Sequence, residues 1–244
     1  MKNLLEGKTI LVTGANRGLG EVVARSAKEN GATVILHGRR EEEVRKIAEE
    51  LQSDYIICDA SNEQEVKIEV EKLLQKIRRI DVLINNAADP SPPTQYLEDI
   101  TISNLDYVIK TNVYSVIFFS KAVIKAMKEQ KSGKIVNVAS IRGLVGKPGR
   151  SVYALSKAAV INLTKTLAVE LAPYVTVNSV SPGPIDKKET SEEQRKIWKK
   201  KSLLNKLPTT KDIAEVIIFL CSSEANFITG QNIVVDGGES LSVK

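Results

Sequence analysis

Residues 8–20 read KTILVTGANRGLG, and this stretch decides the fold. Its first six residues form a short run that is mostly apolar and rich in β-branched side chains. Such a run is typical of a strand buried on both faces of a parallel sheet. Gly14, Gly18 and Gly20 then mark a turn, and a helical period runs on to Asn30. Glycine permits backbone angles and close approaches that a Cβ would forbid. Because a helix N-terminus presents free N–H groups and a positive dipole end, this order predicts a phosphate cradle.

The alternation of strand and helix patterns continues to the end of the chain. Strands alternating with helices predict an α/β fold, a single-domain Rossmann-like doubly wound parallel sheet of about seven strands with helices on both faces. The remaining strands are expected at Thr33–Leu36, Tyr55–Cys58, Val82–Ile84, Lys134–Val138, Val175–Val180 and Ile233–Val235. Helices are expected at Gly18–Asn30, Glu41–Leu51, Glu63–Ile77, Ser103–Gln130 (with a bend), Val152–Leu171 and Lys211–Cys221.

Composition excludes several classes of protein. Hydrophobic residues make up 42% and charged residues 27%, as in globular proteins. The net charge of +5 is not gathered into one long tract, so we expect no nucleic-acid partner. No run approaches the roughly 18 apolar residues of a membrane span, and no signal peptide is visible. The two cysteines lie in apolar stretches and are expected to be reduced, which favours a cytoplasmic protein.

The single histidine limits the chemistry that the chain can perform. One histidine at the end of the second strand leaves no Ser-His-Asp triad and no histidine-based metal cluster. We therefore predict no metal site. Tyr153 and Lys157, by contrast, are four residues apart in a predicted helix and so share a face. An ammonium favours a nearby phenolate, so the pair predicts a tyrosine whose pKa lies below its usual value of about 10 and which can exchange protons.

Short motifs follow the ends of the strands, and in this order they resemble the short-chain dehydrogenase/reductase family along nearly the whole chain. The glycine spacing is Gly-x-x-x-Gly-x-Gly rather than the commoner Gly-x-Gly-x-x-Gly. The most similar members are 3-oxoacyl-carrier-protein reductases and related sugar and alcohol dehydrogenases. The other matching motifs are Asp59-Ala60, Asn85-Asn86-Ala87-Ala88, Ser140, Tyr153-Ala154-Leu155-Ser156-Lys157, Pro182-Gly183 and Asp236-Gly237-Gly238.

The resemblance implies four catalytic residues. Tyr153 would act as acid or base, and Ser140 would hold the same substrate oxygen. Asn112 would organise a water and proton relay to Lys157. The resemblance also implies a nicotinamide dinucleotide site, whose expected contacts are Gly14, Asn16, Arg17, Gly18, Leu19, Gly20, Gly38, Arg39, Asp59, Ala60, Asn86, Ala87, Ala88, Tyr153, Lys157, Pro182, Gly183 and Ile185.

The end of the second strand bears on the choice between the two nicotinamide cofactors. Sites that prefer NAD carry an acid here, which binds the ribose 2′-hydroxyl. Gly38 stands in that place, and Arg39 and Arg17 offer two guanidiniums that can grip a 2′-phosphate, whereas Arg40 is expected to point to solvent. We therefore expect NADP(H) as the preferred cofactor, with NAD(H) as the alternative.

Two departures from the family pattern and one irregular segment remain. Ala88 replaces a glycine, and Lys187 stands where the family has a threonine that contacts the nicotinamide, with Thr190 as a candidate substitute. Residues 185–207 break the strand–helix rhythm and are basic, either as a substrate lid or as a solvated helical flap. Substrate-facing positions are expected in Pro90–Tyr96, Ile141–Arg150 and Ile185–Leu207, whose basic residues suit an acidic or phosphate-bearing substrate or are ordinary surface charges.

These inferences together predict an NADP(H)-dependent oxidoreductase in which residues 1–244 form one dinucleotide-binding catalytic domain. It would reduce a small-molecule carbonyl, for example a 3-oxoacyl thioester, to an alcohol by hydride transfer. Two alternatives stay open: a sugar or alcohol dehydrogenase using NAD(P), and a catalytically silent NADP(H)-binding regulator. The resemblance also implies a homotetramer in which the helices expected at Ser103–Gln130 and Val152–Leu171 contact partner subunits.

Overall fold

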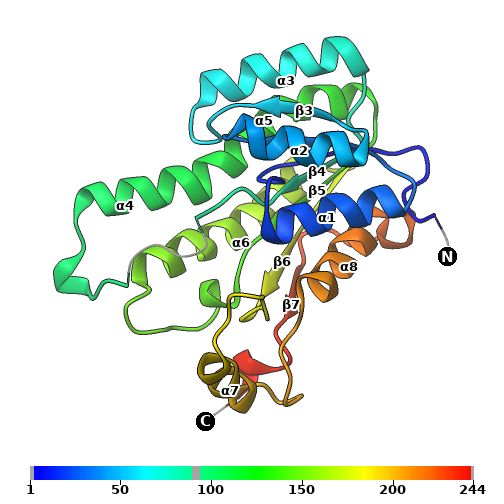
Figure 1. Cartoon of the computed structure of the whole chain (residues 1–244). Coiled ribbons are helices and arrows are strands. Elements are labelled where there is room, and N and C mark those ends of the chain that lie inside the picture. Colours follow the sequence, from blue (N-terminus) through cyan, green and yellow to red (C-terminus); the bar gives the residue numbers. More distant parts are fainter. Residues whose placement is uncertain (1–2, 90–93, 243–244) are drawn as a thin grey trace.

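The computed structural model describes residues 3–89 and 94–242, and these form one seven-stranded sheet with every strand parallel to its neighbours (Figure 1). The strand order is β3-β2-β1-β4-β5-β6-β7, which confirms the predicted doubly wound sheet. The strands are β1 (Thr9–Val12), β2 (Thr33–Gly38), β3 (Asp54–Ile57), β4 (Val82–Asn85), β5 (Gly133–Val138), β6 (Val175–Pro182) and β7 (Asn232–Val235).

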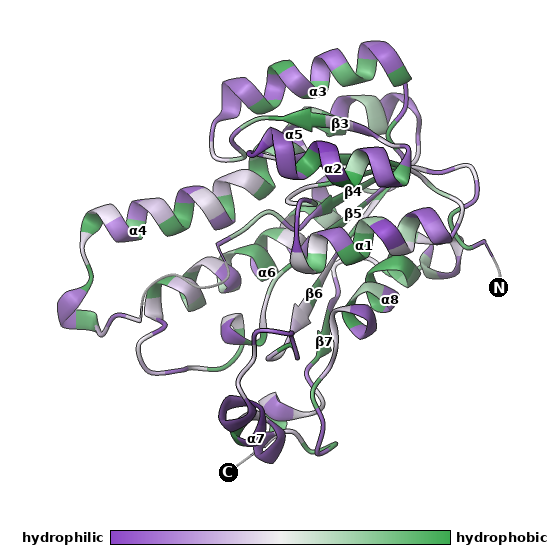
Figure 2. Ribbon diagram, in the orientation of Figure 1, coloured by the Kyte–Doolittle hydropathy of each residue, from purple (hydrophilic) through white to green (hydrophobic). Residues whose placement is uncertain are grey.

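Helices cover both faces of the sheet because its strands are apolar on both sides. In β1, Ile10 and Val12 join one buried cluster and Leu11 joins the other. Figure 2 shows the same division as apolar strands between helices whose outer sides are polar. The first cluster is covered by α1 (Gly18–Glu29), α2 (Glu41–Leu51) and α8 (Thr210–Cys221), and the second by α3 (Glu63–Ile77), α5 (Ser115–Glu129) and α6 (Ser151–Leu171).

The helix expected at Ser103–Gln130 is interrupted. It consists of α4 (Ile102–Ile109), a π-helical segment at Lys110–Tyr114, and α5. A π-helical turn accommodates one extra residue and occurs often at functional sites. Here it contains Asn112, whose side chain is completely buried. The structure therefore shows a widened turn within this helical stretch, and that turn holds a polar side chain in a buried position.

Residues 185–207 form an irregular segment between β6 and α8, and hydrogen bonds of Asp186 hold its two ends together. The Asp186 amide donates to the Pro208 carbonyl over 2.9 Å, and Arg195 Nε donates to Asp186 Oδ1 over 2.7 Å. The segment contains α7 (Glu192–Lys201), which buries none of its side chains and is the most hydrophilic helix in Figure 2. After α7, the segment contacts the C-terminal region, where the Leu204 amide donates to the Gly237 carbonyl over 3.2 Å.

The helices also bear on whether the chain could cross a bilayer. Within residues 3–89 and 94–242, none combines the length and the apolar character that a spanning segment needs.

Candidate active site

The predicted site residues gather at the carboxyl edge of the sheet. The strand order runs outward in opposite directions from β1 and β4, so the loops that follow these two strands diverge. In sheets of this kind, ligands bind in the crevice at this point. The glycine-rich loop follows β1, and the residues that follow β4, β5 and β6 form the other side. This topology brings together residues that lie far apart in the sequence.

The glycine loop is shaped by packing within the protein and leaves space at the start of α1. Gly14 has φ +64°, and a Cβ on Gly20 would overlap the Gly14 carbonyl oxygen. A Cβ on Gly18, by contrast, would meet no atom within 4 Å. Arg17 occupies the N-cap position of α1 and provides no side-chain cap. The helix therefore offers N–H groups toward open space, which suits a pyrophosphate.

Thr13 and Asn86 hold this loop against the end of β4. Thr13 Oγ1 accepts hydrogen bonds from the amides of Asn86 and Ala87, each over 2.9 Å. Asn86 Nδ2 donates to the carbonyls of Thr13 and Gly14 over 3.0 and 3.1 Å. The Asn86 side chain, expected as a cofactor contact, is thus engaged in positioning the glycine loop.

His37 connects the ends of three strands beneath the crevice. Its side chain is 1% exposed; Nδ1 accepts from the Gly14 amide over 3.3 Å, and Nε2 lies 3.1 Å from the Cys58 carbonyl oxygen. The ring packs on Phe119 with 4.6 Å between centroids. Burial lowers the pKa of His37 to about 4, so at neutral pH the uncharged ring accepts at Nδ1 and donates from Nε2. The sequence placed His37 at the cofactor corner but did not indicate this structural role.

We expect His37 to make the protein sensitive to acid. Its pKa is about 4 when folded and 6.5 as a free group, so between these values the unfolded chain binds a proton that the folded protein excludes. The free energy of unfolding should therefore fall as pH drops from 6.5, by about 3 kcal/mol at pH 4 from this residue. His37→Asn retains an acceptor and cannot titrate. Urea midpoints at pH 7 and pH 4.5 should differ less for this variant than for the wild type, and equal differences would contradict the prediction.

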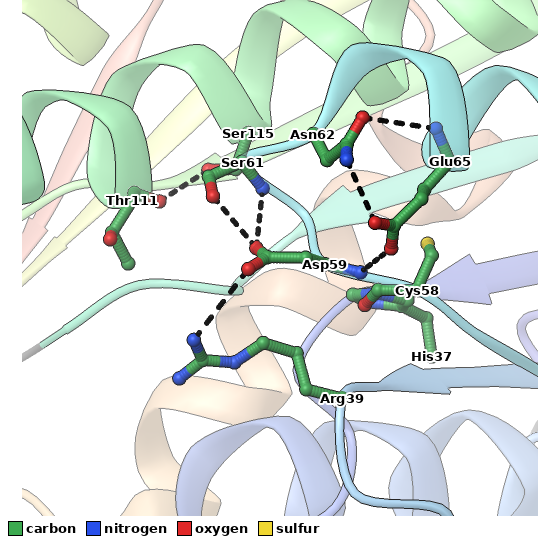
Figure 3. A network of polar contacts seen from close by, with 9 residues as sticks. All are labelled: His37, Arg39, Cys58, Asp59, Ser61, Asn62, Glu65, Thr111 and Ser115. Atoms are coloured by element: carbon green, nitrogen blue, oxygen red, sulfur yellow. Dashed lines mark hydrogen bonds and ion pairs between the residues drawn. The ribbon is translucent and has the colours of Figure 1, made fainter.

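The corner beyond β2 and β3 contains Arg39 and Asp59, each expected as a cofactor contact (Figure 3). Arg39 Nη1 lies 3.9 Å from Asp59 Oδ2, while Asp59 Oδ1 accepts from the Ser61 amide and hydroxyl over 2.9 and 2.8 Å. Burial raises the pKa of Asp59, but the bonds from Ser61 and the charge of Arg39 together bring it below its usual value. An ionised Asp59 therefore lies beside the guanidinium expected to grip a 2′-phosphate.

A second acid at this corner was not predicted. Asn16 Nδ2 donates to Glu43 Oε2 over 2.6 Å, and Arg40 Nη1 lies 2.9 Å from Glu43 Oε1. A Cβ on Gly38 would lie 2.6 Å from Val44 Cγ2, so this position has no space for a side chain. Arg40 is largely exposed, as expected, and Glu43 reaches the glycine loop from the first turn of α2.

Ser140, Tyr153 and Lys157 lie together at the end of β5. Burial raises the pKa of Tyr153, and a hydrogen bond with Ser140 and the charges of Arg150 and Arg142 only partly offset it. Lys157 Nζ lies 5.9 Å from the centre of the Tyr153 ring and donates to the Val138 carbonyl over 2.9 Å. Burial lowers the pKa of Lys157 to about 8. The expected net lowering of the Tyr153 pKa is thus wrong for this structure, because burial of the phenol outweighs the nearby positive charges.

Asn112 links this group to the loop after β4. Its Oδ1 accepts from the Asp89 amide over 2.8 Å, and its Nδ2 donates to Ser156 Oγ over 3.1 Å. Ser156 in turn donates to the Tyr153 carbonyl over 2.7 Å. The four residues expected to be catalytic are therefore brought to one end of α6. Asn112 hydrogen-bonds with Ser156, which precedes Lys157 in the sequence, and not with Lys157 itself.

The remaining predicted contacts follow β6. A Cβ on Gly183 would lie 2.7 Å from Asp236 Cβ, so this glycine allows the loop to pass close to the end of β7. Thr190 Oγ1 accepts from the Lys187 amide over 3.1 Å, which places a threonine hydroxyl beside the position where the family has one. Of the expected substrate-facing stretch Pro90–Tyr96, residues 90–93 lie outside the described residues. Within the described ranges, no three His, Cys, Asp or Glu side chains are grouped so as to hold a metal.

Comparisons with known proteins agree with this geometry. A family model described as enoyl-(acyl carrier protein) reductase matches residues 14–240. The 3-oxoacyl-[acyl-carrier-protein] reductase of Thermotoga maritima is 37% identical over 243 residues, covering 96% of this chain and 98% of that protein. The corresponding reductase of Aquifex aeolicus is 34% identical over 250 residues, covering 98% and 99%.

A solved structure resembles the chain over almost its full length. The gluconate 5-dehydrogenase of Burkholderia cenocepacia, in complex with NADP and tartrate, has a TM-score of 0.94 and 25% identity, covering 99% of this chain and 98% of that one. The overall sequence and the fold thus agree with these relatives. The chain belongs to the short-chain dehydrogenase/reductase family of oxidoreductases.

Proposed function

We propose that this oxidoreductase reduces a small-molecule carbonyl to an alcohol, and that the carbonyl is a 3-oxoacyl thioester. The observation that carries the proposal is the contact between Tyr153 and Ser140 at the end of β5, one helical turn from the buried Lys157. The relatives from Thermotoga maritima and Aquifex aeolicus are 3-oxoacyl-[acyl-carrier-protein] reductases, which supports the thioester. NADP(H) is the cofactor, and when bound it supplies the hydride.

The protonated phenol of Tyr153 suits the reductive direction. A phenol that remains protonated at neutral pH is the form that a general acid needs. Ser140 and Tyr153 donate to the carbonyl oxygen from one side, and the Tyr153 proton moves to that oxygen as it becomes an alcohol. The Lys157 ammonium, largely protonated at pH 7 with a pKa of about 8, stabilises the phenolate that remains. Asn112 fixes the start of α6 through Ser156.

The residues that would hold the cofactor fit its parts. Gly18 and the free start of α1 accommodate the pyrophosphate, and Asp59 lies at the corner expected for the adenine. Arg17 and Arg39 are exposed, and Arg39 lies beside Asp59, so both guanidiniums would be available to a 2′-phosphate. The expected contacts that follow β4 and β6 would bind the nicotinamide end of the same cofactor. The catalytic and binding roles of all these residues are part of the proposal.

Replacing Arg39 by glutamine tests the choice of cofactor. Removing a guanidinium that grips a dianion should raise the KM for NADPH about tenfold or more, whereas the KM for NADH should change little. The measurement is kcat/KM for both cofactors with the same carbonyl substrate. Arg45→Gln, a guanidinium on the exposed side of α2, is the matched control. Equal losses for NADPH and NADH would contradict the assignment of Arg39.

A second candidate substrate is a sugar acid or another hydroxy acid. The Arg150 guanidinium is close enough to influence the pKa of Tyr153, and a carboxylate beside the reacting carbon would suit it, whereas Arg142 is paired with Glu239. The structural relative from Burkholderia cenocepacia is a gluconate 5-dehydrogenase, which favours the same class of substrate. A panel of 3-oxoacyl thioesters, keto acids and simple ketones, followed by absorbance of the reduced nicotinamide, distinguishes the two. Turnover of keto acids alone would overturn the thioester.

The proposal extends to assembly and location. Residues 1–244 act as one domain, residues 185–207 act as a substrate lid, and the protein works in the cytoplasm as a homotetramer. Apolar side chains exposed on the long helices support the assembly: Tyr107, Tyr114, Ile117, Leu155 and Val169. Light scattering of the purified protein tests it, and a monomer would refute it.

A further inference from the structure

The first turn of α2 brings a carboxylate to the corner that governs the choice of cofactor. Glu43 Oε2 accepts from Asn16 Nδ2 over 2.6 Å, and Asn16 Oδ1 lies 3.2 Å from where a Cβ on Gly38 would be. Gly38 stands where NAD-preferring sites carry their acid. The Glu43 carboxylate is therefore hydrogen-bonded to Asn16, the side chain that lies next to Gly38.

An acid cannot be supplied from position 38 itself. A Cβ there would lie 2.6 Å from Val44 Cγ2, and Val44 is fully buried in the core beneath α2. Real Cβ atoms do not approach so closely, so the buried Val44 side chain or α2 itself would have to shift to admit a side chain. Glu43, the neighbour of Val44, instead brings its carboxylate to the same corner from the other side.

Each arginine at this corner lies beside a carboxylate of the chain. Arg40 Nη1 lies 2.9 Å from Glu43 Oε1, and Arg39 Nη1 lies 3.9 Å from Asp59 Oδ2. A 2′-phosphate must share these guanidiniums with carboxylates of the chain and must approach the Glu43 charge. A ribose 2′-hydroxyl carries no charge and meets no such repulsion, so a carboxylate here disfavours NADP(H) more than NAD(H).

We propose that Glu43 is a specificity-determining residue that reduces the preference for NADP(H) and keeps NAD(H) usable. Its carboxylate repels the 2′-phosphate directly, and with Asn16 it takes the place of the acid that Gly38 cannot carry. The inference rests on the proposed use of NADP(H), because it concerns how strongly the same site distinguishes two cofactors.

Glu43→Gln isolates the charge, since the amide oxygen of glutamine still accepts from Asn16. The dissociation constants of NADPH and NADH, measured by fluorescence titration at low salt, give the preference as a ratio. We expect the NADH-to-NADPH ratio to rise about tenfold, mainly because NADPH binds more tightly. The gain should shrink in high salt, because ions screen a partly exposed carboxylate.

Glu42→Gln is the matched control, because it removes the same charge from the same exposed helical turn. Its ratio should stay within about twofold of the wild type, since an exposed charge farther from the corner is screened. A second pair, Arg40→Gln alone and combined with Glu43→Gln, distinguishes repulsion from the release of Arg40. The proposal requires the ratio to rise in both backgrounds, and a rise only where Arg40 is present would overturn direct repulsion.

The titrations also distinguish the two proposals. A wild type that binds neither cofactor would refute the proposed function, and this inference with it. A wild type that binds both, with a ratio that Glu43→Gln changes no more than Glu42→Gln does, would refute the role of Glu43 and leave the proposed function standing.

Discussion

Replacing Tyr153 by phenylalanine is expected to lower kcat about a thousandfold and to leave the affinity for NADPH unchanged. The substitution removes only the hydroxyl that hydrogen-bonds with Ser140, so the carbonyl oxygen loses its proton donor. The ring itself can keep its place on α6 beside Lys157. Steady-state turnover and a fluorescence titration with NADPH, made on the same preparation, separate the two effects.

Tyr174→Phe is the matched control, because this partly exposed tyrosine lies just before β6, at the opposite edge of the sheet from the crevice. It should retain full turnover. If Tyr153→Phe retained more than about a tenth of the wild-type kcat, the phenol would not be the general acid. If it lost NADPH binding as well, its hydroxyl would be needed for the site's structure rather than for proton transfer alone.

Replacing Gly20 by alanine should abolish NADPH binding and destabilise the fold. The new Cβ would overlap both the Gly14 carbonyl oxygen and Asn86 Nδ2. The first of these is backbone, so the clash can be relieved only by moving the glycine loop away from α1. We expect the free energy of unfolding to fall by about 1–3 kcal/mol or more, because overpacking forces backbone shifts.

Gly146→Ala provides the comparison, since a Cβ there meets no atom within 4 Å. Urea midpoints and NADPH titrations of both variants test the prediction, and Gly146→Ala should behave as the wild type. Normal NADPH affinity in Gly20→Ala would mean that the close approach of this glycine to the loop is not needed for cofactor binding.

Much of the fold could be predicted because its signals are local. A strand buried on both faces needs a continuous apolar run, and each such run in the sequence became a strand to within a few residues. The widened turn at Lys110–Tyr114 is different, because nothing in its letters separates it from an ordinary helix. It becomes visible only when Asn112 is seen bound to Asp89 and Ser156.

The candidate site divides in the same way. Gly14 could be named in advance because it opens the turn between the first strand and a helix, whereas Ser140 was expected from the family resemblance. The contact between Asn16 and Glu43 spans 27 positions and depends on how α2 packs, so no local pattern indicates it. The Tyr153 pKa was expected to fall because the spacing to Lys157 was visible, whereas the burial of the phenol was not.

The π-helical turn also limits how this protein can be engineered or can diverge. Deleting one residue from Lys110–Tyr114 would restore a regular helix and would look like a stabilising simplification. Because the widened turn absorbs one extra residue, α5 would keep its place against the second cluster after such a deletion. The inward position of Asn112 would be lost, and with it the hydrogen bonds to Asp89 and Ser156. Length changes are therefore expected to be tolerated in surface loops, but not at this point of the helix.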